Sequence, residues 1–450
     1  MNASPRRSRL KNILGGSAGN LVEWFDWYVY SAFALYFAPA FFPKGDQTAQ
    51  LLQTAAIFAV GFVMRPIGAW LMGVYADHKG RKAGLTLSVS LMCLGSLMIA
   101  VAPTHAQAGI LSPAILLLAR VTQGLSLGGE YGSSATYMSE IADRERRGFW
   151  SSFLYVTIIG GQLCALALLV FLQAVLGEEA MHSWGWRVGF IAGAVLAIVV
   201  FFIRRRLDET VSYENVAAQA DRRKSSIGNL FRDHPREALL VIAITAGGTA
   251  SFYAYTIYLQ KFLANTSGFD KATASQLMTV ALAIMLLLQP LAGRLSDRVG
   301  RRPLMIFFGV CGTLFTYPIF VTLAGTHSVG QAFALVMAAL VMVTGYTSIN
   351  AIVKAELFPA RIRALGVGLP YALTVAIFGG TTEYIALGLK NIGHENWFFF
   401  YVAGCGLISL LVYVFMGEPS KRSYLERETR ELRAGGPQFV NIAPVSPTGS

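Results

Sequence analysis

Five charged side chains lie inside long apolar stretches of the first half of this 450-residue sequence, where a charge is costly to place. Two of them are arginines, whose planar guanidinium groups can bind a carboxylate through two parallel hydrogen bonds. The other three are carboxylates, which can exchange a proton when their surroundings favour the neutral form. The five residues are Glu23, Asp26, Arg65, Arg120 and Glu130.

These charges predict a site that binds an anion and takes up a proton. Arg65 and Arg120 are predicted to bind the substrate, because two guanidinium groups match the two carboxylates of a dicarboxylate. Glu23 and Asp26, which are three residues apart and share a helix face, are predicted to carry a coupling proton together with Glu130. Protonation and substrate binding would then share the same arginines. The alternative is that all five charges form internal ion pairs that only fix helix packing.

Uncharged polar side chains in other apolar stretches are predicted to complete the substrate site. Any single tyrosine is more often structural than functional, because tyrosines are common at membrane interfaces. Lys354 shares a helix face with Asn350, but it lies close enough to the end of a predicted span to reach an interface. The set is Gln123, Tyr155, Gln162, Tyr255 and Asn350.

The composition places these residues in a membrane protein. The sequence is 54% hydrophobic and 14% charged, with a mean hydropathy of +0.51, whereas soluble domains carry about a quarter charged residues. Apolar runs of about 20 residues recur along the chain, and each can cross a hydrocarbon core about 30 Å thick. The net charge of +12 resides mainly in short loops, so it reflects membrane topology rather than nucleic-acid binding.

Apolar windows predict an all-α polytopic protein with twelve transmembrane helices in two six-helix bundles. The expected organisation is a cytoplasmic segment at 1–17, an N-terminal bundle at 18–204, a cytoplasmic linker at 205–237, a C-terminal bundle at 238–417 and a disordered tail at 418–450. The predicted spans are 18–42, 50–76, 84–102, 110–138, 149–175, 185–204, 238–262, 272–295, 303–324, 331–354, 364–389 and 397–417.

The distribution of basic residues predicts the orientation. Of the 37 Lys and Arg residues, 30 fall on one side of the predicted spans, which places both termini in the cytoplasm. None of the six histidines lies at mid-membrane, and the four cysteines never occur at close spacing. The sequence therefore predicts no metal centre, no cofactor and no catalytic nucleophile, and it argues against an enzyme.

A loop motif occurs twice and indicates that the two bundles are repeats. The Gly-x-x-x-Asp-x-x-Gly-Arg pattern follows span 2 and returns 220 residues later, after span 8. A Glu and Arg pair after span 4 returns 216 residues later, after span 10. Because both copies face the cytoplasm, the halves are predicted to be parallel repeats with a latch at each loop, where the Asp caps the next helix or pairs with an arginine. The predicted gating residues are Gly73, Asp77, Gly80, Arg81, Gly293, Asp297, Gly300 and Arg301.

At these loops the sequence resembles the major facilitator superfamily. Further motifs resemble its branch of metabolite:proton symporters, which includes citrate, shikimate and osmolyte carriers. The branch motifs are Gly19-Asn-Leu-Val-Glu23-Trp-Phe-Asp26-Trp-Tyr-Val-Tyr30, Arg65-Pro66-Ile-Gly68 and Arg120-x-x-Gln123-Gly124-x-x-x-Gly128-Gly129-Glu130-Tyr-Gly132.

This resemblance implies a proton-coupled carrier in a bacterial inner membrane that works by alternating access and acts as a monomer. Its expected partners are protons, the lipid bilayer and a small carboxylate, with a dicarboxylate such as 2-oxoglutarate as the leading substrate. Citrate, shikimate and a zwitterionic osmolyte such as proline or betaine remain alternatives. A channel would instead need a pore-lining ring or filter loop.

Overall fold

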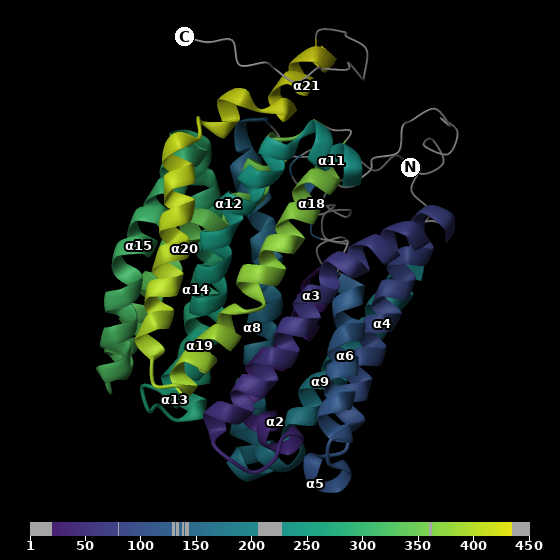
Figure 1. Cartoon of the computed structure of the whole chain (residues 1–450), viewed down its shortest axis with the longest axis vertical. Coiled ribbons are helices and arrows are strands. Elements are labelled where there is room, and N and C mark those ends of the chain that lie inside the picture. The colour runs from purple at the N-terminus through teal and green to yellow at the C-terminus, as the bar shows by residue number, and fades with distance from the viewer. Residues whose placement is uncertain are drawn as a thin grey trace, which may run out of the picture.

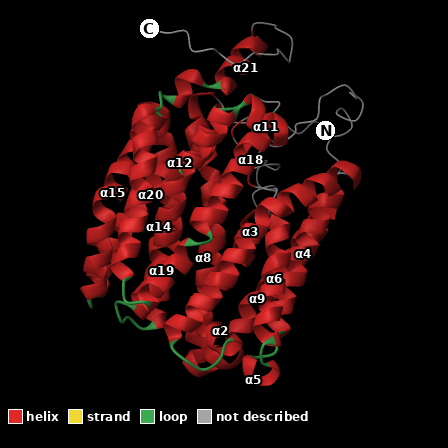
Figure 2. Cartoon of the chain, viewed as in Figure 1, coloured by secondary structure: helices red, strands yellow, loops and turns green. Residues whose placement is uncertain are grey.

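The computed structural model describes residues 20–79, 81–127, 131, 135–136, 139, 144–205, 227–359 and 362–433. Helices make up nearly all of these residues, and no strand occurs among them (Figure 2). In a bilayer a helix is the natural choice for such apolar segments, because it satisfies every backbone hydrogen bond within the segment. The all-α class predicted from the sequence is therefore confirmed.

The first bundle contains six spans. A helix over residues 20–32 turns at Phe33 into α2, and the later spans are single long helices. Short helical segments join some of them. The elements are α2 (Ala34–Phe41), α3 (Gln47–Lys79), α4 (Arg81–Val101), α5 (His105–Ala108), α6 (Leu111–Leu127), η1 (Arg144–Arg146), α8 (Arg147–Ala180), η2 (Met181–Gly185) and α9 (Trp186–Arg205).

The second bundle repeats this plan, with two of its spans interrupted by a π-helical turn. Such turns occur often at functional sites in helical proteins. The elements are α11 (Ile227–Asp233), α12 (Pro235–Tyr253), η3 (Ala254–Tyr258), α13 (Leu259–Asn265), α14 (Lys271–Val299), α15 (Arg301–Gly325), α16 (Val329–Thr347), α17 (Asn350–Glu356), α18 (Arg363–Thr374), η4 (Val375–Gly379), α19 (Thr382–Asn391), α20 (Glu395–Phe415), η5 (Pro419–Arg422) and α21 (Tyr424–Arg433).

The two bundles lie side by side, with α3, α4, α6 and α9 in one group and α12, α14, α15, α18 and α20 in the other (Figure 1). The most extensive contact between them runs along α8 and α14. Glycines permit the close approach, since a Cβ on Gly293 would lie 2.5 Å from the Gly148 carbonyl oxygen and one on Gly148 would lie 2.6 Å from the Gly293 carbonyl oxygen. We call the end of the molecule that carries η5 and α21 the tail end, and the end that carries α2, α5 and α13 the far end.

The described helices account for the twelve predicted spans. Eight continuous helical stretches of the described chain are long and apolar enough to cross a membrane, and one of them, Arg147–Phe202, contains two predicted spans. Shorter apolar helices cover Thr86–Val101 and Leu111–Leu127. Large apolar side chains such as Trp70, Leu287 and Phe400 are exposed on the outer faces of the bundles, as expected for surfaces in contact with lipid.

Two boundaries differ from the sequence prediction. The expected linker at 205–237 is shorter than predicted, because α11 and the start of α12 occupy 227–237. The tail expected to be disordered from residue 418 on begins with η5 and α21, whose Leu425 is only 4% exposed. Apolar periodicity missed α21 because its ten residues are mostly charged, and they are held by ion pairs rather than by a broad apolar face.

Candidate functional site

A small cavity, with a volume of about 20 Å³, lies between the two bundles. Its wall combines residues of the 20–32 helix, α3 and α6 from the first bundle with residues of α18 and η4 from the second. A cavity at the interface of two repeats is where transporters of this architecture bind substrate. The lining residues are Asn20, Glu23, Trp24, Arg65, Leu127, Tyr131, Gly368, Tyr371, Ala372 and Val375.

Arg65 is the cation that lines this cavity. Its side chain is almost fully buried, with the guanidinium carbon 4.0 Å from the ring centre of Trp27 and 4.1 Å from that of Phe62. These rings hold the group by cation–π attraction but leave its N–H donors available. Nε and Nη2 have no hydrogen-bond partner among the described residues. An anion entering the cavity can therefore meet two unused donors of one planar fork.

Glu23 lines the same cavity as Arg65, and its side chain is fully buried. The neighbouring helix face is fixed by hydrogen bonds: the Trp24 indole donates to Asn20 Oδ1 at 3.0 Å, and Asn20 Nδ2 donates to Thr157 Oγ1 at 2.6 Å. Glu23, which the sequence predicts to couple protons, thus lines the same cavity as the predicted substrate-binding arginine.

Asp26 belongs to a separate network inside the first bundle. Ser96 Oγ donates to Asp26 Oδ1, and Gln123 Nε2 donates to Asp26 Oδ2 at 2.9 Å. The Gln123 amide oxygen in turn accepts from Arg120 at 2.7 Å, and a Cβ at Gly193 would collide with the carboxylate. Three residues advance a helix by about 300°, so Glu23 and Asp26 point about 60° apart, which is enough to face the cavity and the bundle interior respectively.

Arg120 and Gln123 lie outside the cavity wall. The Arg120 guanidinium carbon is 3.8 Å from the ring centre of Trp27 and 4.4 Å from that of Tyr30. Arg65 approaches the same indole, so Trp27 carries both predicted arginines. The structure therefore brings the two guanidinium groups to one ring, but only Arg65 reaches the cavity.

The remaining predicted substrate ligands are also buried away from the cavity wall. The Tyr155 ring meets Phe252 edge-on, the Tyr255 hydroxyl bonds to Thr316, and Gln162 donates to the Thr256 carbonyl oxygen of the other bundle at 2.5 Å. Asn350 is linked to the wall through one step, because its Oδ1 accepts from the hydroxyl of Tyr131 at 2.7 Å. Glu130 lies outside the described residues.

Two lysines that the sequence analysis assigned to span ends are fully buried. Lys261 pairs with Glu383 at 2.8 Å and donates to Ser31 of the other bundle at 2.7 Å. Lys354 donates to the Tyr131 hydroxyl at 2.7 Å. Buried basic residues of the predicted spans therefore include these two lysines as well as Arg65 and Arg120. The signal was the position of Lys354 one turn after Asn350, on a shared helix face.

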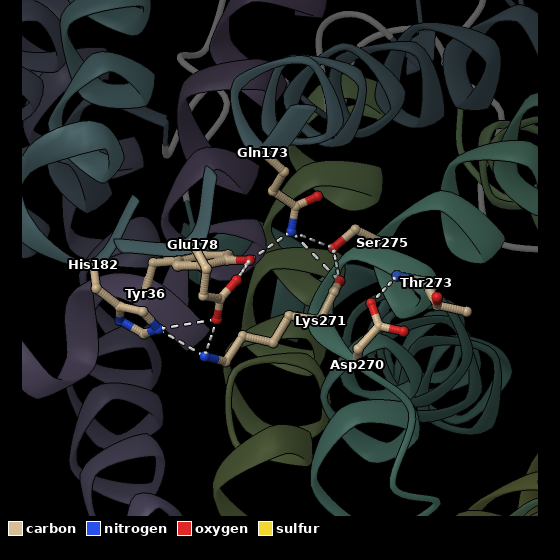
Figure 3. Close-up of polar contacts among 8 residues, drawn as sticks. All are labelled: Tyr36, Gln173, Glu178, His182, Asp270, Lys271, Thr273 and Ser275. Atoms are coloured by element: carbon tan, nitrogen blue, oxygen red, sulfur yellow. Dashed lines mark hydrogen bonds and ion pairs between the residues drawn. The ribbon is translucent and has the colours of Figure 1, made fainter. Parts of the chain in front are cut away.

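At the far end, charged side chains of both bundles meet (Figure 3). The Lys271 ammonium at the start of α14 lies 2.7 Å from Glu178 Oε1 and 2.7 Å from His182 Nε2, which both belong to the first bundle. Tyr36 donates to Glu178, and Gln173 donates to Tyr36 at 2.8 Å. We call Tyr36, Gln173, Glu178, His182 and Lys271 the far-end cluster.

The far-end cluster perturbs the titration of its members. Burial alone would raise the pKa of Glu178, but the hydrogen bond and the charge of Lys271 outweigh it and lower the pKa. Burial and the Lys271 ammonium both lower the pKa of His182. Asp270 caps α14 by accepting from the Thr273 N–H at 2.8 Å. Hydrogen bonds from the Thr273 side chain and from this N–H lower the pKa of Asp270.

At the tail end, Asp297 joins the two bundles. Its carboxylate accepts from the backbone N–H groups of Gly148 and Phe149, at 2.7 and 2.9 Å, and pairs with Arg301 at 2.9 Å. The predicted arginine pairing is present, but the helix that Asp297 caps is α8 of the opposite bundle and not the next helix, as expected from the sequence. Glu418 accepts from the first N–H groups of α15 instead, at 2.8 and 3.1 Å.

The other predicted latch residues divide into two sets. Gly293 makes the close contact with α8, and Gly300 has a φ of 97°, a conformation that favours glycine. For the first copy of the motif, at Gly73, Asp77, Gly80 and Arg81, the side chains lie outside the described residues. The tail helix α21 adds ion pairs at this end, from Glu426 to Arg147 at 3.6 Å and from Glu428 to Arg363 at 2.5 Å.

Comparison with known proteins identifies the class of protein that this fold and cavity define. The sequence pattern of the Major Facilitator Superfamily matches residues 17–380 and 262–443, and the chain belongs to this superfamily of membrane transporters. A solved D-xylose-proton symporter has the same fold, with a TM-score of 0.70 at 18% identity, over 91% of this chain and 98% of that one.

Among individual proteins, the chain is 52% identical to the alpha-ketoglutarate permease of Escherichia coli over 421 residues, which cover 94% of this chain and 96% of the permease. It is 31% identical to the citrate-proton symporter of Klebsiella pneumoniae, over 91% of this chain and 93% of that one. It is 28% identical to a proline/betaine transporter of Salmonella typhimurium, over 92% and 84%. The family resemblance inferred from the sequence motifs is confirmed.

Proposed function

We propose that the chain is a proton-coupled symporter that imports α-ketoglutarate or a closely related dicarboxylate by alternating access. The observation that carries this proposal is Arg65, a buried cation with unused N–H donors in the cavity between the two bundles. Such a group has a natural partner in a substrate carboxylate. The permease that shares 52% of its residues with this chain supports the choice of dicarboxylate.

Proton coupling is assigned to the carboxylates of the first helix. Glu23 shares the cavity with Arg65, so a proton on Glu23 would leave the guanidinium free for an incoming carboxylate. Asp26 is one turn away and is linked to Arg120 through hydrogen bonds with Gln123. Asp26 would therefore be a second proton acceptor, located inside the first bundle. Uptake of a proton and of an anion would therefore favour each other, as symport requires.

Alternating access is assigned to contacts at the two ends of the bundles. The far-end cluster and the Lys261–Ser31 contact hold the bundles together on one side of the cavity, and Asp297 with α8 holds them on the other. The tail end is assigned to the cytoplasm from the distribution of basic residues, with both termini there, in a bacterial inner membrane. A monomer contains the complete cavity.

Citrate is the alternative substrate that a specific observation favours, because citrate-proton symporters are 31% identical to this chain over almost its whole length. A third carboxylate would need a further cation at the cavity. The two substrates are distinguishable by competition.

The test is uptake into proteoliposomes that contain the purified full chain. Radiolabelled α-ketoglutarate should accumulate when the outside is made acidic, and an ionophore that collapses the proton gradient should abolish the accumulation. Unlabelled succinate should compete, whereas proline and betaine should not. Stronger competition by citrate would select the alternative substrate. Absence of gradient-driven uptake of any carboxylate would overturn the proposed function.

A further inference from the structure

Lys354 is a buried cation of the second bundle that the proposed function leaves unused. We infer that Lys354 binds one carboxylate of the dicarboxylate substrate, in place of the Tyr131 hydroxyl that it contacts in this structure. Arg65 then binds the other carboxylate, so that the substrate links the two bundles. This inference rests on the proposed function and identifies Lys354 as the second cation that binds the substrate.

The contacts of Lys354 show that its charge is poorly compensated. The side chain is fully buried, and its Nζ donates to the Tyr131 hydroxyl at 2.7 Å. The same Nζ lies 4.1 Å from the ring centre of Tyr371 and 4.7 Å from that of Tyr131. Cation–π contacts and one hydrogen bond to a neutral hydroxyl offset only part of the cost of burying an ammonium group.

Three other buried cations of the described chain are each paired with a carboxylate. Lys261 has Glu383, Arg301 has Asp297 and Arg363 has Glu428, each at 2.9 Å or less. No Asp or Glu within the described ranges forms an ion pair with Lys354. A buried cation without an anion is typical of a binding site, because the ligand supplies the missing charge.

The position of Lys354 places it directly behind the cavity wall. Tyr131 and Tyr371 both line the cavity together with Arg65, and their rings are stacked with centres 3.4 Å apart and planes 9° apart. Tyr131 comes from the first bundle and Tyr371 from the second, so this stack closes the interface between them. Separation of the two rings would give the cavity access to Lys354.

The hydrogen bonds of the Tyr131 hydroxyl show how a substrate carboxylate could replace it at Lys354. Its hydroxyl donates to Asn350 Oδ1 at 2.7 Å and accepts from Lys354 Nζ. A carboxylate oxygen in the place of this hydroxyl would join two ionised groups, so that the ligand would supply the negative charge that the neutral hydroxyl lacks. Because Arg65 belongs to the first bundle and Lys354 to the second, only a ligand with two anionic ends can use both.

The inference is tested by equilibrium binding to purified full-length protein with two ligands. α-Ketoglutarate carries two carboxylates, and 2-oxopentanoate has the same carbon chain without the terminal carboxylate. In the wild type, α-ketoglutarate should bind more tightly. In K354Q and K354M the Kd for α-ketoglutarate should rise by about 10- to 100-fold, while the Kd for 2-oxopentanoate should change by less than about threefold. K390Q, which alters a lysine at the far end, is the matched control and should resemble the wild type.

The thermal stability of the ligand-free protein provides a second readout. Replacement of a buried cation that lacks an anionic partner by Met should leave the Tm unchanged or raise it. Three outcomes would overturn the inference, because each indicates a structural lysine. They are an unaltered preference for α-ketoglutarate in K354M, an equal loss of affinity for both ligands, and a marked fall in Tm. If the wild type itself binds no dicarboxylate, the proposed function fails, and the inference fails with it.

Discussion

Replacement of Arg65 by lysine separates the charge of this residue from its geometry. The substitution keeps a cation in the cavity but removes the planar fork, whose Nε and Nη2 are without partners among the described residues. A lysine can offer a carboxylate one charge-assisted bond where the guanidinium offers two parallel ones. The change therefore tests whether the substrate is bound by the fork or merely attracted by the charge.

The expected magnitude follows from the contacts of Arg65. Loss of one hydrogen bond to a charged group costs about 1.5–3 kcal/mol. The ammonium would also lose part of the attraction to the rings of Trp27 and Phe62, on the order of 0.5–1 kcal/mol. The two effects together come to about 2–4 kcal/mol. We therefore expect R65K to raise the Kd for α-ketoglutarate by about 30- to 700-fold, since 1.4 kcal/mol corresponds to a factor of ten.

R120K is the matched control. Arg120 is stacked on the same indole as Arg65, but it does not line the cavity and is hydrogen-bonded to Gln123. Its Kd for α-ketoglutarate should change by less than about threefold, while its Tm should fall at least as much as that of R65K because it loses an internal bond. Binding can be measured by isothermal titration calorimetry on both purified variants. Wild-type affinity in R65K, or an equal loss of affinity in R120K, would refute the placement of the substrate at Arg65.

Three further predictions concern coupling and the two ends of the bundles. E23Q should abolish pH-driven accumulation of α-ketoglutarate in proteoliposomes but retain counterflow exchange, and preserved accumulation would remove Glu23 from the proton path. D297N should slow transport by about tenfold or more yet leave the Kd almost unchanged, because a neutral amide caps α8 and pairs with Arg301 less strongly than the carboxylate does. A large rise in Kd would contradict the latch. Acidification from about pH 7.5 to about 5.5 should open the far end, because burial and the Lys271 ammonium both lower the pKa of His182 in this structure, and this pKa rises once the bundles separate there. Glu178 stays ionised because its pKa is lowered. Maleimide labelling of a cysteine at Ser275 should then become faster in the wild type but not in H182Q, and equal pH dependence in both proteins would exclude His182.

The far-end prediction depends on the surroundings of His182 in the closed arrangement. Its ring nitrogen faces the Lys271 ammonium at 2.7 Å and Glu178 at 3.3 Å, and its ring packs against Tyr36 at 5.0 Å between centres. A proton on His182 would place two cations in contact, which Glu178 alone compensates only in part. Protonation therefore favours the arrangement in which Lys271 has moved away.

The sequence by itself determined the class of the protein and the order of its helices. Runs of about 20 apolar residues leave the backbone no choice but a helix in a bilayer, so the twelve spans follow from composition alone. The repeated Gly-x-x-x-Asp-x-x-Gly-Arg loop likewise indicated, from the sequence alone, that the chain consists of two repeated halves. Charges such as Arg65 and Glu23 were recognisable as candidate site residues because their burial in lipid would be too costly without a function.

Only the tertiary structure decided which of the candidate residues face the cavity. Glu23 and Asp26 are one turn apart, and the rotation of a single helix relative to its neighbours directs one to the cavity and the other to Ser96 and Gln123. Sequence spacing gives the angle between two side chains but not the angle of the helix about its own axis, which is set by packing against other helices. For the same reason Lys354 looked like the end of a span, although its surroundings, contributed by Tyr131 and Tyr371 from opposite bundles, place it behind the wall of the cavity.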